Sequence, residues 1–429
     1  MLSQKSFVEE LRWRGLLQDI SPGAEEQLAK TPTSGYIGFD PTSDSLHLGS
    51  LSQIITLMRF QKCGHKPIVL LGGATGMVGD PSGKSDERNL LDAQTLEKNL
   101  KGIKNQLEKF LDFQNSPSAA EMCNNYDWFR EFSFLDFIRE AGKHITVNYM
   151  MAKDSVQKRL TTGISFTEFS YQLVQGWDFY TLWKEKNCLL QMGGSDQWGN
   201  MTTGTEFIRR KAGGQAFALT TKLITKADGG KFGKTEEGNI WLDPAKTSPY
   251  KFYQFWLNVS DSDASDYLRF FTFLTQEAIE GEEKNHKIAP QERIMQKKLA
   301  DLLTELVHGH ESVKLAKDAS GLLFNGNMET FRTLNENLFL EIFSGVPVFE
   351  VTPAALKSDS DILNLLCLHT QIFPSKGEAR KLIQGGGLSI NREKITDVTH
   401  VVLQEGLLNG KYLIVQKGKK NFFLIKVAF

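Results

Sequence analysis

The chain has few cysteines, almost no net charge and no long apolar run, and each of these features excludes a class of protein. Its four cysteines are scattered without the spacing of a metal site or a disulfide framework. No apolar run approaches the roughly 20 residues that span a bilayer. The first ten residues mix Lys5, Glu9 and Glu10 with apolar residues, unlike a signal peptide. We therefore expect a cytoplasmic protein with reduced thiols and no membrane segment.

The composition is that of an ordinary globular protein, with 429 residues, 40% of them hydrophobic and 24% charged, and a net charge of −1. Such a chain is expected to form two or three domains. Residues 357–429 contain 11 Lys and Arg against 6 Asp and Glu, a net charge of +5, so the preceding 356 residues carry −6. A basic C-terminal module indicates an anionic partner such as a nucleic acid, although a solvated charged surface explains the charge equally well.

Residues 36–50 predict a short strand, a turn and the start of a helix. Residues 36–39 alternate as a strand does, and Asp40-Pro41-Thr42 has the composition of a turn. Apolar residues at helical spacing follow. Either Asp44 or Ser45 is predicted to cap this helix.

His47 and Gly49 are therefore expected where a strand gives way to a helix N-terminus. Free backbone N–H groups and the helix dipole attract anions there, and Gly49 lets a ring or a phosphate approach the backbone. Taken alone, a histidine near a helix start is more often a cap or a surface residue.

A second glycine-rich stretch follows the short apolar run 67–71, which predicts a buried parallel strand. The loop at residues 72–85 is not a phosphate-binding P-loop, because Gly79 and Gly83 enclose three residues where that motif needs four. Its glycines nevertheless allow close approach of a ligand. Asp80 is expected at the carboxyl edge of the sheet, where open α/β sheets bind ligands.

A helix is predicted from Ser165, which forms a capping box with Glu168, to about residue 183. Tyr171, Gln175 and Asp178 fall at i, i+4 and i+7 and therefore share one face of it. Such a polar triplet is about as often the solvent face of a helix. The functional alternative is that a tyrosine, an amide and a carboxylate together hold a small zwitterion.

Two further loops carry residues suited to nucleotide chemistry. The short strand 189–192 ends in glycines and Asp196, a carboxylate placed to accept hydrogen bonds from vicinal hydroxyls such as those of ribose. The loop 226–235 is loosened by glycines and carries Lys231 and Lys234. Two ammonium groups of this kind can stabilise a polyphosphate during transfer, although a solvated turn is the simpler interpretation of the loop alone.

The remaining segments complete a mixed α/β pattern. We expect one helix and a linker over residues 1–34, a long helix over 96–110, and helices throughout 248–323. An aromatic-rich segment at 126–137 is either core or subunit interface. Residues 325–357 lack a clean period and are expected to be a linker. The C-terminal module shows a basic helix at 378–384 and a strand at 388–391.

In combination these stretches resemble the bacterial tyrosyl-tRNA synthetases, a class I aminoacyl-tRNA synthetase family. His47-Leu48-Gly49-Ser50 is similar to the His-Ile-Gly-His signature, with Ser50 in place of the second histidine. Lys231-Phe232-Gly233-Lys234-Thr235 corresponds to the Lys-Met-Ser-Lys-Ser loop but lacks a signature serine. Further segments match motifs of this family and occur in the same order along the chain: residues 38–42, 72–76, 79–84, 194–200 and 248–255. The C-terminal module is similar to the ribosomal S4 RNA-binding unit, so the resemblance covers nearly the whole chain.

The resemblance implies a fold and a domain organisation. The fold would be α/β, a Rossmann-like nucleotide-binding parallel sheet followed by an α-helical domain and a small α+β S4-like domain. The domains would be residues 1–225, catalytic with a dimerisation insertion; 226–325, the lysine loop and an anticodon-binding helical domain; 326–356, a linker; and 357–429, the RNA-binding domain.

The resemblance also implies the roles of individual residues. The tyrosine pocket would consist of residues around the phenol (Tyr36, Asp178), around the ammonium group (Asp80, Tyr171, Gln175) and around the rest of the substrate (Gln197, Asp40). ATP would contact Gly38, His47, Gly49, Ser50, Gly194, Asp196 and Lys234, with Asp196 on the ribose. The catalytic set would be Thr42, His47, Lys84, Arg88, Lys231, Lys234 and Thr235, mostly as candidates for the pyrophosphate.

The implied reaction is the attack of the tyrosine carboxylate on the α-phosphate of ATP, followed by transfer of tyrosine to the 3′ end of its tRNA. Mg²⁺ would accompany ATP, with no metal site of the protein's own and no tightly bound cofactor, and the protein would be a homodimer. Three alternatives stay open: a tryptophanyl-tRNA synthetase, a small nucleotidyltransferase, and an RNA-binding protein that has lost catalysis. A tryptophan pocket would have no use for the phenol-binding pair, and a small nucleotidyltransferase would not need the C-terminal module. The retained histidine and lysines argue against a loss of catalysis.

Overall fold

The computed structural model describes residues 6–30, 32–80, 82, 91–114, 116–159, 163–227, 229–230, 232–235, 238–325, 331–332, 334–343, 346–356, 361–418 and 421–428. The chain divides into two compact units. One consists of residues 1–248 and 255–303, and the other of residues 249–254 and 304–429. Among the described helices, none combines the length and the apolar character needed to cross a membrane.

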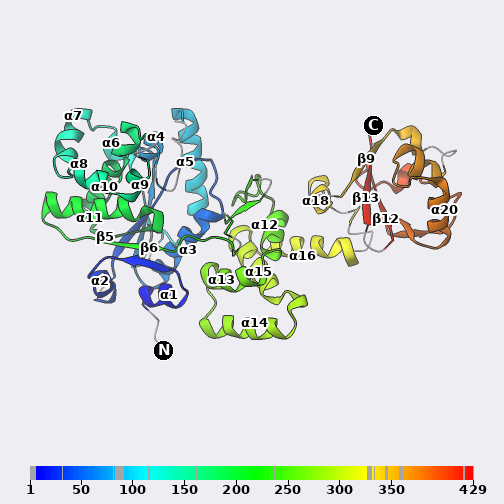
Figure 1. The fold of residues 1–429 in the computed structure, drawn as a ribbon, viewed down its shortest axis with the longest axis horizontal. Helices are drawn as coiled ribbons and strands as arrows, with labels where there is room; N and C mark the ends of the chain where they lie inside the picture. Colours follow the sequence, from blue (N-terminus) through cyan, green and yellow to red (C-terminus); the bar gives the residue numbers. More distant parts are fainter. Residues whose placement is uncertain are drawn as a thin grey trace. The chain divides into compact units, whose positions relative to one another are not determined.

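A six-stranded sheet forms the centre of the first unit, in the order β1-β6-β5-β2-β3-β4 (Figure 1). Its strands are β1 (Leu17–Ile20), β2 (Ser34–Phe39), β3 (Lys66–Leu71), β4 (Glu121–Asn124), β5 (Cys188–Gly194) and β6 (Phe217–Thr221). Neighbouring strands are parallel except β1, which is antiparallel to β6. The predicted parallel sheet is confirmed. Because the strand order reverses at β2, the carboxyl ends of β2 and β5 flank the crevice where such sheets bind ligands.

Helices cover both faces of this sheet. The helical elements of this unit up to residue 212 are α1 (Phe7–Trp13), α2 (Ala24–Lys30), α3 (Leu48–Lys62), α4 (Thr75–Val78), α5 (Ala93–Leu107), α6 (Tyr126–Phe129), α7 (Phe134–Phe137), η1 (Ile138–Gly142), α8 (Val147–Met151), α9 (Asp154–Gln157), α10 (Phe166–Lys186), η2 (Ser195–Gln197) and α11 (Trp198–Ala212). A side chain at Gly35 would meet Phe60 of α3, whereas the next residue, Tyr36, packs on Phe179 of α10. Successive strand residues point to opposite faces, so α3 and α10 lie on opposite sides of β2.

The predicted helical stretch from 248 to 323 is also confirmed. It contains α12 (Pro249–Leu257), α13 (Asp261–Phe271), α14 (Gln276–Ile288), η3 (Pro290–Glu292), α15 (Ile294–His308) and α16 (His310–Asn325), and it follows a short ladder of β7 (Lys234–Thr235) with β8 (Gly238–Asn239). Two buried arginines hold the end of α13: Arg59 of α3 donates to the carbonyls of Phe270 and Thr272, both at 2.9 Å, and Arg14 donates to that of Arg269 at 2.7 Å. Carbonyls at a helix C-terminus lack partners within the helix, and here two arginines supply them.

Two sequence predictions near the N-terminus are wrong. The first 34 residues are not one helix and a linker, because β1 follows α1 and pairs with β6, and α2 follows β1. The cap of α3 is His47 itself, whose Nδ1 accepts from the N–H of Gly49 at 3.0 Å. The two predicted caps have other partners: Ser45 accepts from Gln106, and Asp44 pairs with lysines.

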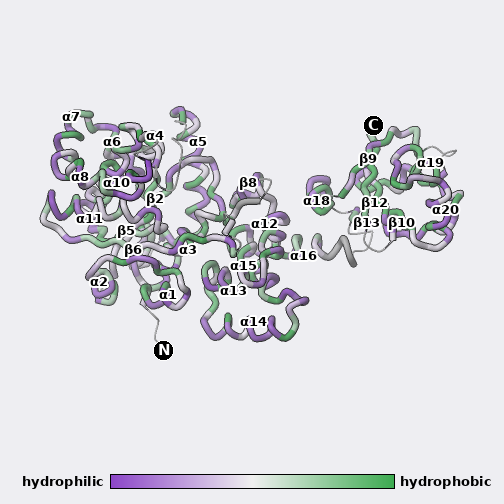
Figure 2. Tube along the Cα trace, in the orientation of Figure 1, coloured by the Kyte–Doolittle hydropathy of each residue, from purple (hydrophilic) through white to green (hydrophobic). Residues whose placement is uncertain are grey.

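The second unit contains a five-stranded sheet in the order β11-β10-β12-β13-β9. Its strands are β9 (Val348–Val351), β10 (Leu388–Ile390), β11 (Glu393–Ile395), β12 (Tyr412–Lys417) and β13 (Asn421–Val427), and its other elements are α18 (Glu336–Ile342), η4 (Pro353–Leu356), α19 (Ile362–Asn364), η5 (Leu365–His369), α20 (Lys376–Gln384) and η6 (Gln404–Gly406). The strands β12 and β13 are hydrophobic along most of their length and contribute to the core of this unit (Figure 2). The predicted helix at 378–384 and strand at 388–391 are confirmed. The stretch expected to be a linker instead contains α18 and β9, and β9 is an edge strand of the sheet.

Candidate active site

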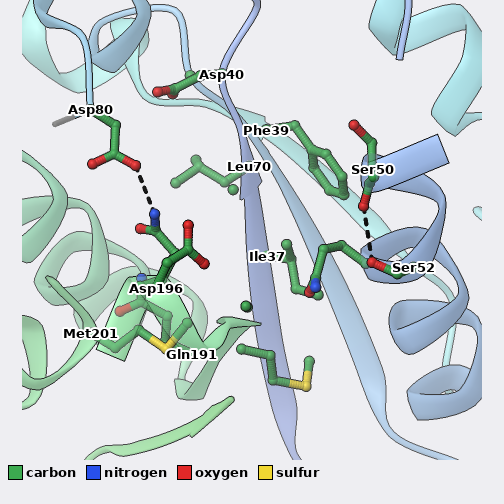
Figure 3. Close-up of a pocket in the computed structure, with 18 of the residues that line it drawn as sticks. Ile37, Phe39, Asp40, Ser50, Ser52, Leu70, Asp80, Gln191, Asp196 and Met201 are labelled. Atoms are coloured by element: carbon green, nitrogen blue, oxygen red, sulfur yellow. Dashed lines mark hydrogen bonds between the residues drawn. The ribbon is translucent and has the colours of Figure 1, made fainter. Parts of the chain in front are cut away.

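A pocket of about 450 Å³ opens at the carboxyl ends of β2, β3 and β5. Figure 3 shows Asp80 and Asp196 on one side of it and Ser50 and Ser52 on the other, with Ile37 between them. Of the candidate residues, those that line it are Tyr36, Gly38, Asp40, His47, Gly49, Ser50, Asp80, Tyr171, Gln175, Asp178, Gly194, Asp196 and Gln197. Candidate residues from four separate stretches of the sequence thus meet in one cavity.

The other candidates are placed differently. Thr42 is exposed and ends a tight turn, in which its N–H donates to the carbonyl of Asp40. Lys84, Arg88 and Lys231 lie outside the described residues. For Lys234 and Thr235 the structure describes the backbone, which forms β7.

The deepest part of the pocket contains Tyr36 and Asp178, each only 1% exposed. Within the described part of the chain, the phenolic oxygen of Tyr36 has no hydrogen-bond partner. Burial and the neighbouring charge of Asp178 raise the pKa of this tyrosine well above its ordinary value, so the hydroxyl keeps its proton. A buried polar atom without a partner costs free energy, and a ligand that bonds to it removes that cost.

Asp178 is held by two side chains that the sequence analysis did not assign to the site. Asn125 donates to one carboxylate oxygen at 3.0 Å, and the indole Nε1 of Trp128 donates to the other at 2.9 Å. Burial raises the pKa of Asp178 to about 8, against the lowering effect of these two hydrogen bonds. The carboxylate is thereby fixed in position, and it is able to change charge near neutral pH.

Two more carboxylates lie nearer the mouth of the pocket. Asp40 accepts from Thr75 Oγ1 at 2.7 Å and from the hydroxyl of Tyr171 at 3.0 Å. Asp80 accepts from Gln197 Nε2 at 2.7 Å and from the backbone N–H of Ser82 at 3.0 Å. These bonds orient both acids, and the pair gives this side of the pocket a negative field that favours a cation.

Gln175 and Asp196 complete this polar wall. The side-chain oxygen of Gln175 is buried and has no hydrogen-bond partner among the described residues, so it is available as an acceptor. Burial and then the charge of Asp80 raise the pKa of Asp196. The unfavourable interaction between these two carboxylates is relieved by a bound cation or by hydroxyl donors.

On the opposite side, His47 and Gly49 form the N-terminus of α3. A side chain at Gly49 would lie 2.8 Å from Cε1 of His47, so only glycine lets the imidazole fold over this turn. The Nδ1 atom accepts the Gly49 N–H, which makes Nε2 the donor of the neutral ring. A helix N-terminus with such a donor favours an anionic ligand.

The stretch after the lysine loop is joined to this helix end by backbone hydrogen bonds. The N–H of Leu48 donates to the carbonyl of Ile240 at 3.0 Å, and the N–H of Leu242 donates to that of Leu46 at 2.8 Å. The ring of Trp241 also meets that of His47 edge to face at 6.0 Å. The segment at residues 240–242, nearly 200 positions from His47 in the sequence, is therefore fixed against the start of α3.

Sequence reasoning missed several residues of the site. Asn125 follows the end of β4, just as the predicted site residues Asp40, Asp80 and Asp196 follow β2, β3 and β5. This shared position after a strand could have predicted that Asn125 belongs to the site. Trp128 was assigned only to core or interface. Gln191 of β5 lies directly beside Tyr36 in the ladder of β2 with β5, and its buried side-chain oxygen has no partner within the described part of the chain.

Comparison with known proteins agrees with this geometry. Residues 28–325 match the family model of class I tRNA synthetases (W and Y), and residues 339–425 match that of the tyrosine–tRNA ligase SYY-like C-terminal domain. The tyrosine–tRNA ligase of Bacteroides thetaiotaomicron is 59% identical over 98% of this chain and 99% of its own length. That of Porphyromonas gingivalis is 57% identical over 98% and 100%, respectively.

A solved structure gives the same result. The C-terminally truncated mitochondrial tyrosyl-tRNA synthetase of Aspergillus nidulans is 29% identical, with a TM-score of 0.68, over 75% of this chain and 95% of that one. The family model spans well over half of the chain, and the curated relatives span nearly all of it. The chain therefore belongs to the class I tRNA synthetase family that includes the bacterial tyrosine–tRNA ligases.

Proposed function

We propose that the protein is a tyrosine–tRNA ligase, which activates L-tyrosine with ATP to form tyrosyl-adenylate and pyrophosphate and then transfers tyrosine to the 3′ end of its tRNA. The observation that carries this proposal is the buried pair Tyr36 and Asp178 at the bottom of the pocket. A substrate phenol that enters the pocket can donate to Asp178 and accept from Tyr36. An indole has no oxygen that could use both partners, so this pair favours tyrosine over tryptophan.

At the other end of the amino acid, we assign the ammonium group to Asp80, Tyr171 and Gln175, with Gln197 and Asp40 completing the pocket. The support is their common location and the orientation of the two carboxylates by hydrogen bonds. A protonated amine would place a favourable positive charge beside these carboxylates, where the charge of Asp80 already raises the pKa of the neighbouring Asp196. The α-carboxylate of the substrate is then directed toward the mouth of the pocket.

The nucleotide is assigned to the mouth, where Gly38, His47, Gly49, Ser50, Gly194 and Asp196 lie. Gly38 has open space where a side chain would be, which suits a flat base or ribose, and Asp196 would accept the ribose hydroxyls. The helix N-terminus at His47 would face the phosphates. For the pyrophosphate we retain Thr42, Lys84, Arg88, Lys231, Lys234 and Thr235 as candidates from the sequence.

The chemistry requires no covalent intermediate on the enzyme. The tyrosine carboxylate oxygen forms a bond to the α-phosphorus while the bond to the pyrophosphate oxygen breaks, and the pyrophosphate leaves with its electron pair. The protein would act through positioning and through charge stabilisation at the helix end and the lysines. We propose that ATP enters as its Mg²⁺ complex, with the ion held mainly by phosphate oxygens, as is common for Mg²⁺.

The remaining assignments concern partners. We propose that the basic C-terminal module binds the tRNA, as the S4-like resemblance suggests, and that the protein works in the cytoplasm. We also propose a homodimer. Its support is an apolar surface around α7 and α8 and at the start of α10, where the most exposed side chains are Phe134, Leu135, Val147 and Phe166. Large exposed apolar patches commonly mark contacts between proteins.

The first experiment is ATP–pyrophosphate exchange with each of the twenty amino acids in turn, without tRNA. We expect exchange with tyrosine alone. Exchange with tryptophan would assign the chain to the other branch of its family, and no exchange with any amino acid would support an RNA-binding protein without catalysis.

A further inference from the structure

Phe232, which lies between the two lysines of the signature loop, is packed into an aromatic cluster of the helical region. Its ring centroid is 5.1 Å from those of Tyr267 and Phe271 on α13 and about 6 Å from those of Phe255 and Trp256 on α12. The Phe271 ring is stacked on it with an interplanar angle of 23°. Aromatic pairs at these separations contribute beyond their buried area, so this ring is firmly held.

The same helix also holds the beginning of the loop. The hydroxyl of Tyr267 donates to the carbonyl of Thr225 at 3.3 Å, and the N–H of Ala227 donates to a carboxylate oxygen of Asp263 at 2.9 Å. Since Arg59 fixes the end of α13 to α3, α13 is a platform whose position is set relative to the helix that carries His47.

Gly233 makes the second contact of the loop. Its φ is +73°, and a side chain there would lie 3.0 Å from Cβ of Leu48. Its carbonyl accepts from the N–H of Ile240 at 2.9 Å, and the carbonyl of Ile240 accepts from Leu48. Only glycine combines this backbone conformation with such close contact, so Gly233 lies directly against the N-terminus of α3.

We infer that Phe232 and Gly233 are positioning residues for adenylate formation: Phe232 anchors the loop on α13, and Gly233 seats it against the phosphate-facing end of α3. This inference rests on the proposed function and explains why the loop carries an aromatic residue and a glycine where a signature serine is absent. The two signature lysines flank this pair in the sequence. A segment fixed at two points keeps its position with little further loss of conformational freedom, and misplacement by about 1 Å can cost on the order of 100-fold in rate.

Simple core packing is the alternative explanation of Phe232. Trp256 and Phe271 of the cluster are fully buried, whereas Phe232 is only partly buried and lines the pocket. A ring at the boundary between cluster and pocket is suited to linking the loop to the helices, and its contribution to overall stability should be smaller than that of the buried members.

The test compares Phe232→Ala, Phe232→Leu and Gly233→Ala with Phe113→Ala, a control whose partly buried side chain lies between α5 and β4 and does not line the pocket. We expect Phe232→Ala and Gly233→Ala to lower kcat/KM for ATP in pyrophosphate exchange by roughly 10- to 100-fold. The tyrosine Kd, measured by equilibrium dialysis, should stay within about twofold. Phe232→Leu, which restores an apolar anchor, should recover most of the loss, and the control should behave as wild type.

Unchanged ATP kinetics in Phe232→Ala would overturn the inference, as would an equal loss of tyrosine affinity. Melting temperatures are measured in parallel, and a Phe232→Ala protein that does not fold leaves Gly233→Ala and Phe232→Leu to decide. Failure of the proposed function is recognised separately, because the wild-type protein would then show no tyrosine-dependent exchange at all.

Discussion

The indole of Trp128 donates a hydrogen bond to the carboxylate of Asp178 at 2.9 Å, so the aromatic segment after β4 reaches the bottom of the pocket at the carboxyl ends of β2 and β5. Other rings of this segment, such as Phe132 and Phe137, pack around Trp177. Phe134 is instead 65% exposed. One short segment therefore supports the pocket with some of its aromatic residues and exposes an apolar surface with others.

The first prediction concerns discrimination between tyrosine and phenylalanine. Asp178→Ala and Tyr36→Phe remove the partners of the phenol, and an unmade buried hydrogen bond costs about 1–3 kcal/mol. We expect the ratio of kcat/KM for tyrosine over phenylalanine to fall about 10- to 100-fold, with little change in KM for ATP. Tyr149→Phe also loses a hydroxyl bond, to the carbonyl of Thr202, but outside the pocket, and should leave the ratio unchanged. An unaltered ratio in Asp178→Ala would refute the assignment of the phenol site.

A second prediction tests the support of Asp178. Trp128→Phe keeps a ring and removes the Nε1 donor, and loss of a donor to the ionised carboxylate raises the pKa of Asp178 further. We expect the tyrosine Kd at pH 7 to rise about fivefold, equivalent to the roughly 1 kcal/mol of one hydrogen bond, and the pH profile of binding to shift to higher pH. Trp183→Phe removes an indole bond to Gln215 on the surface and is the control. Identical pH profiles for both variants would contradict the proposed coupling.

The raised pKa of Asp178 also predicts a pH dependence of stability. Burial raises this pKa from 3.8 to about 8 in the folded protein. Between these values the folded state binds more protons than the unfolded state, so the free energy of unfolding falls as pH rises through this window and levels off above it. Asp178→Asn lacks this titration. We expect the melting temperature of the wild type to decline relative to that of the variant between about pH 5 and pH 8, whereas a constant difference across this range would show that Asp178 titrates normally.

Gly38 provides a test of the nucleotide side. It lies in β2 and lines the pocket, and nothing is within 4 Å of the position that a Cβ would take. Gly38→Ala should therefore fold normally but project a methyl group into the nucleotide space, raising KM for ATP on the order of tenfold. Gly281 on α14 is equally open, and Gly281→Ala should leave kinetics unchanged and stabilise the helix by up to about 1 kcal/mol. Equal ATP kinetics in the two variants would exclude the base or ribose from this position.

The proposed dimer is tested by charge on the apolar surface. Phe166→Asp places a carboxylate where the ring is 68% exposed, and sedimentation velocity should show a shift from dimer to monomer because an unpaired buried charge is costly at an interface. Ile288→Asp, at a side chain 83% exposed at the end of α14, is the control. A wild-type protein that sediments as a monomer would refute the proposal directly.

The sequence predicted those parts of the fold whose signals are local. The strands β3 and β5 are short apolar runs that end at glycines, and β2 alternates and ends at the turn Asp40-Pro41-Thr42. The spacing of Tyr171, Gln175 and Asp178 likewise placed them on one face of α10. The edge strand β1 was missed because the sequence Leu-Gln-Asp-Ile does not by itself predict a strand. Only its pairing with β6 in the sheet identifies it as one. Asn125 and Trp128 were missed for a similar reason, since they reach Asp178 from about 50 positions away.

The pairing of β9 with β13 has a consequence for how the C-terminal unit is made. These strands are parallel neighbours, with Val348 opposite Leu424, so β9 can join the sheet only after β13 has been synthesised. Contacts between such distant segments form slowly because a long loop must close first. A fragment that begins at residue 357 would lack β9 and leave β13 as an unprotected edge open to pairing with other chains. The smallest fragment of this unit that remains monomeric in isolation should therefore begin before residue 346.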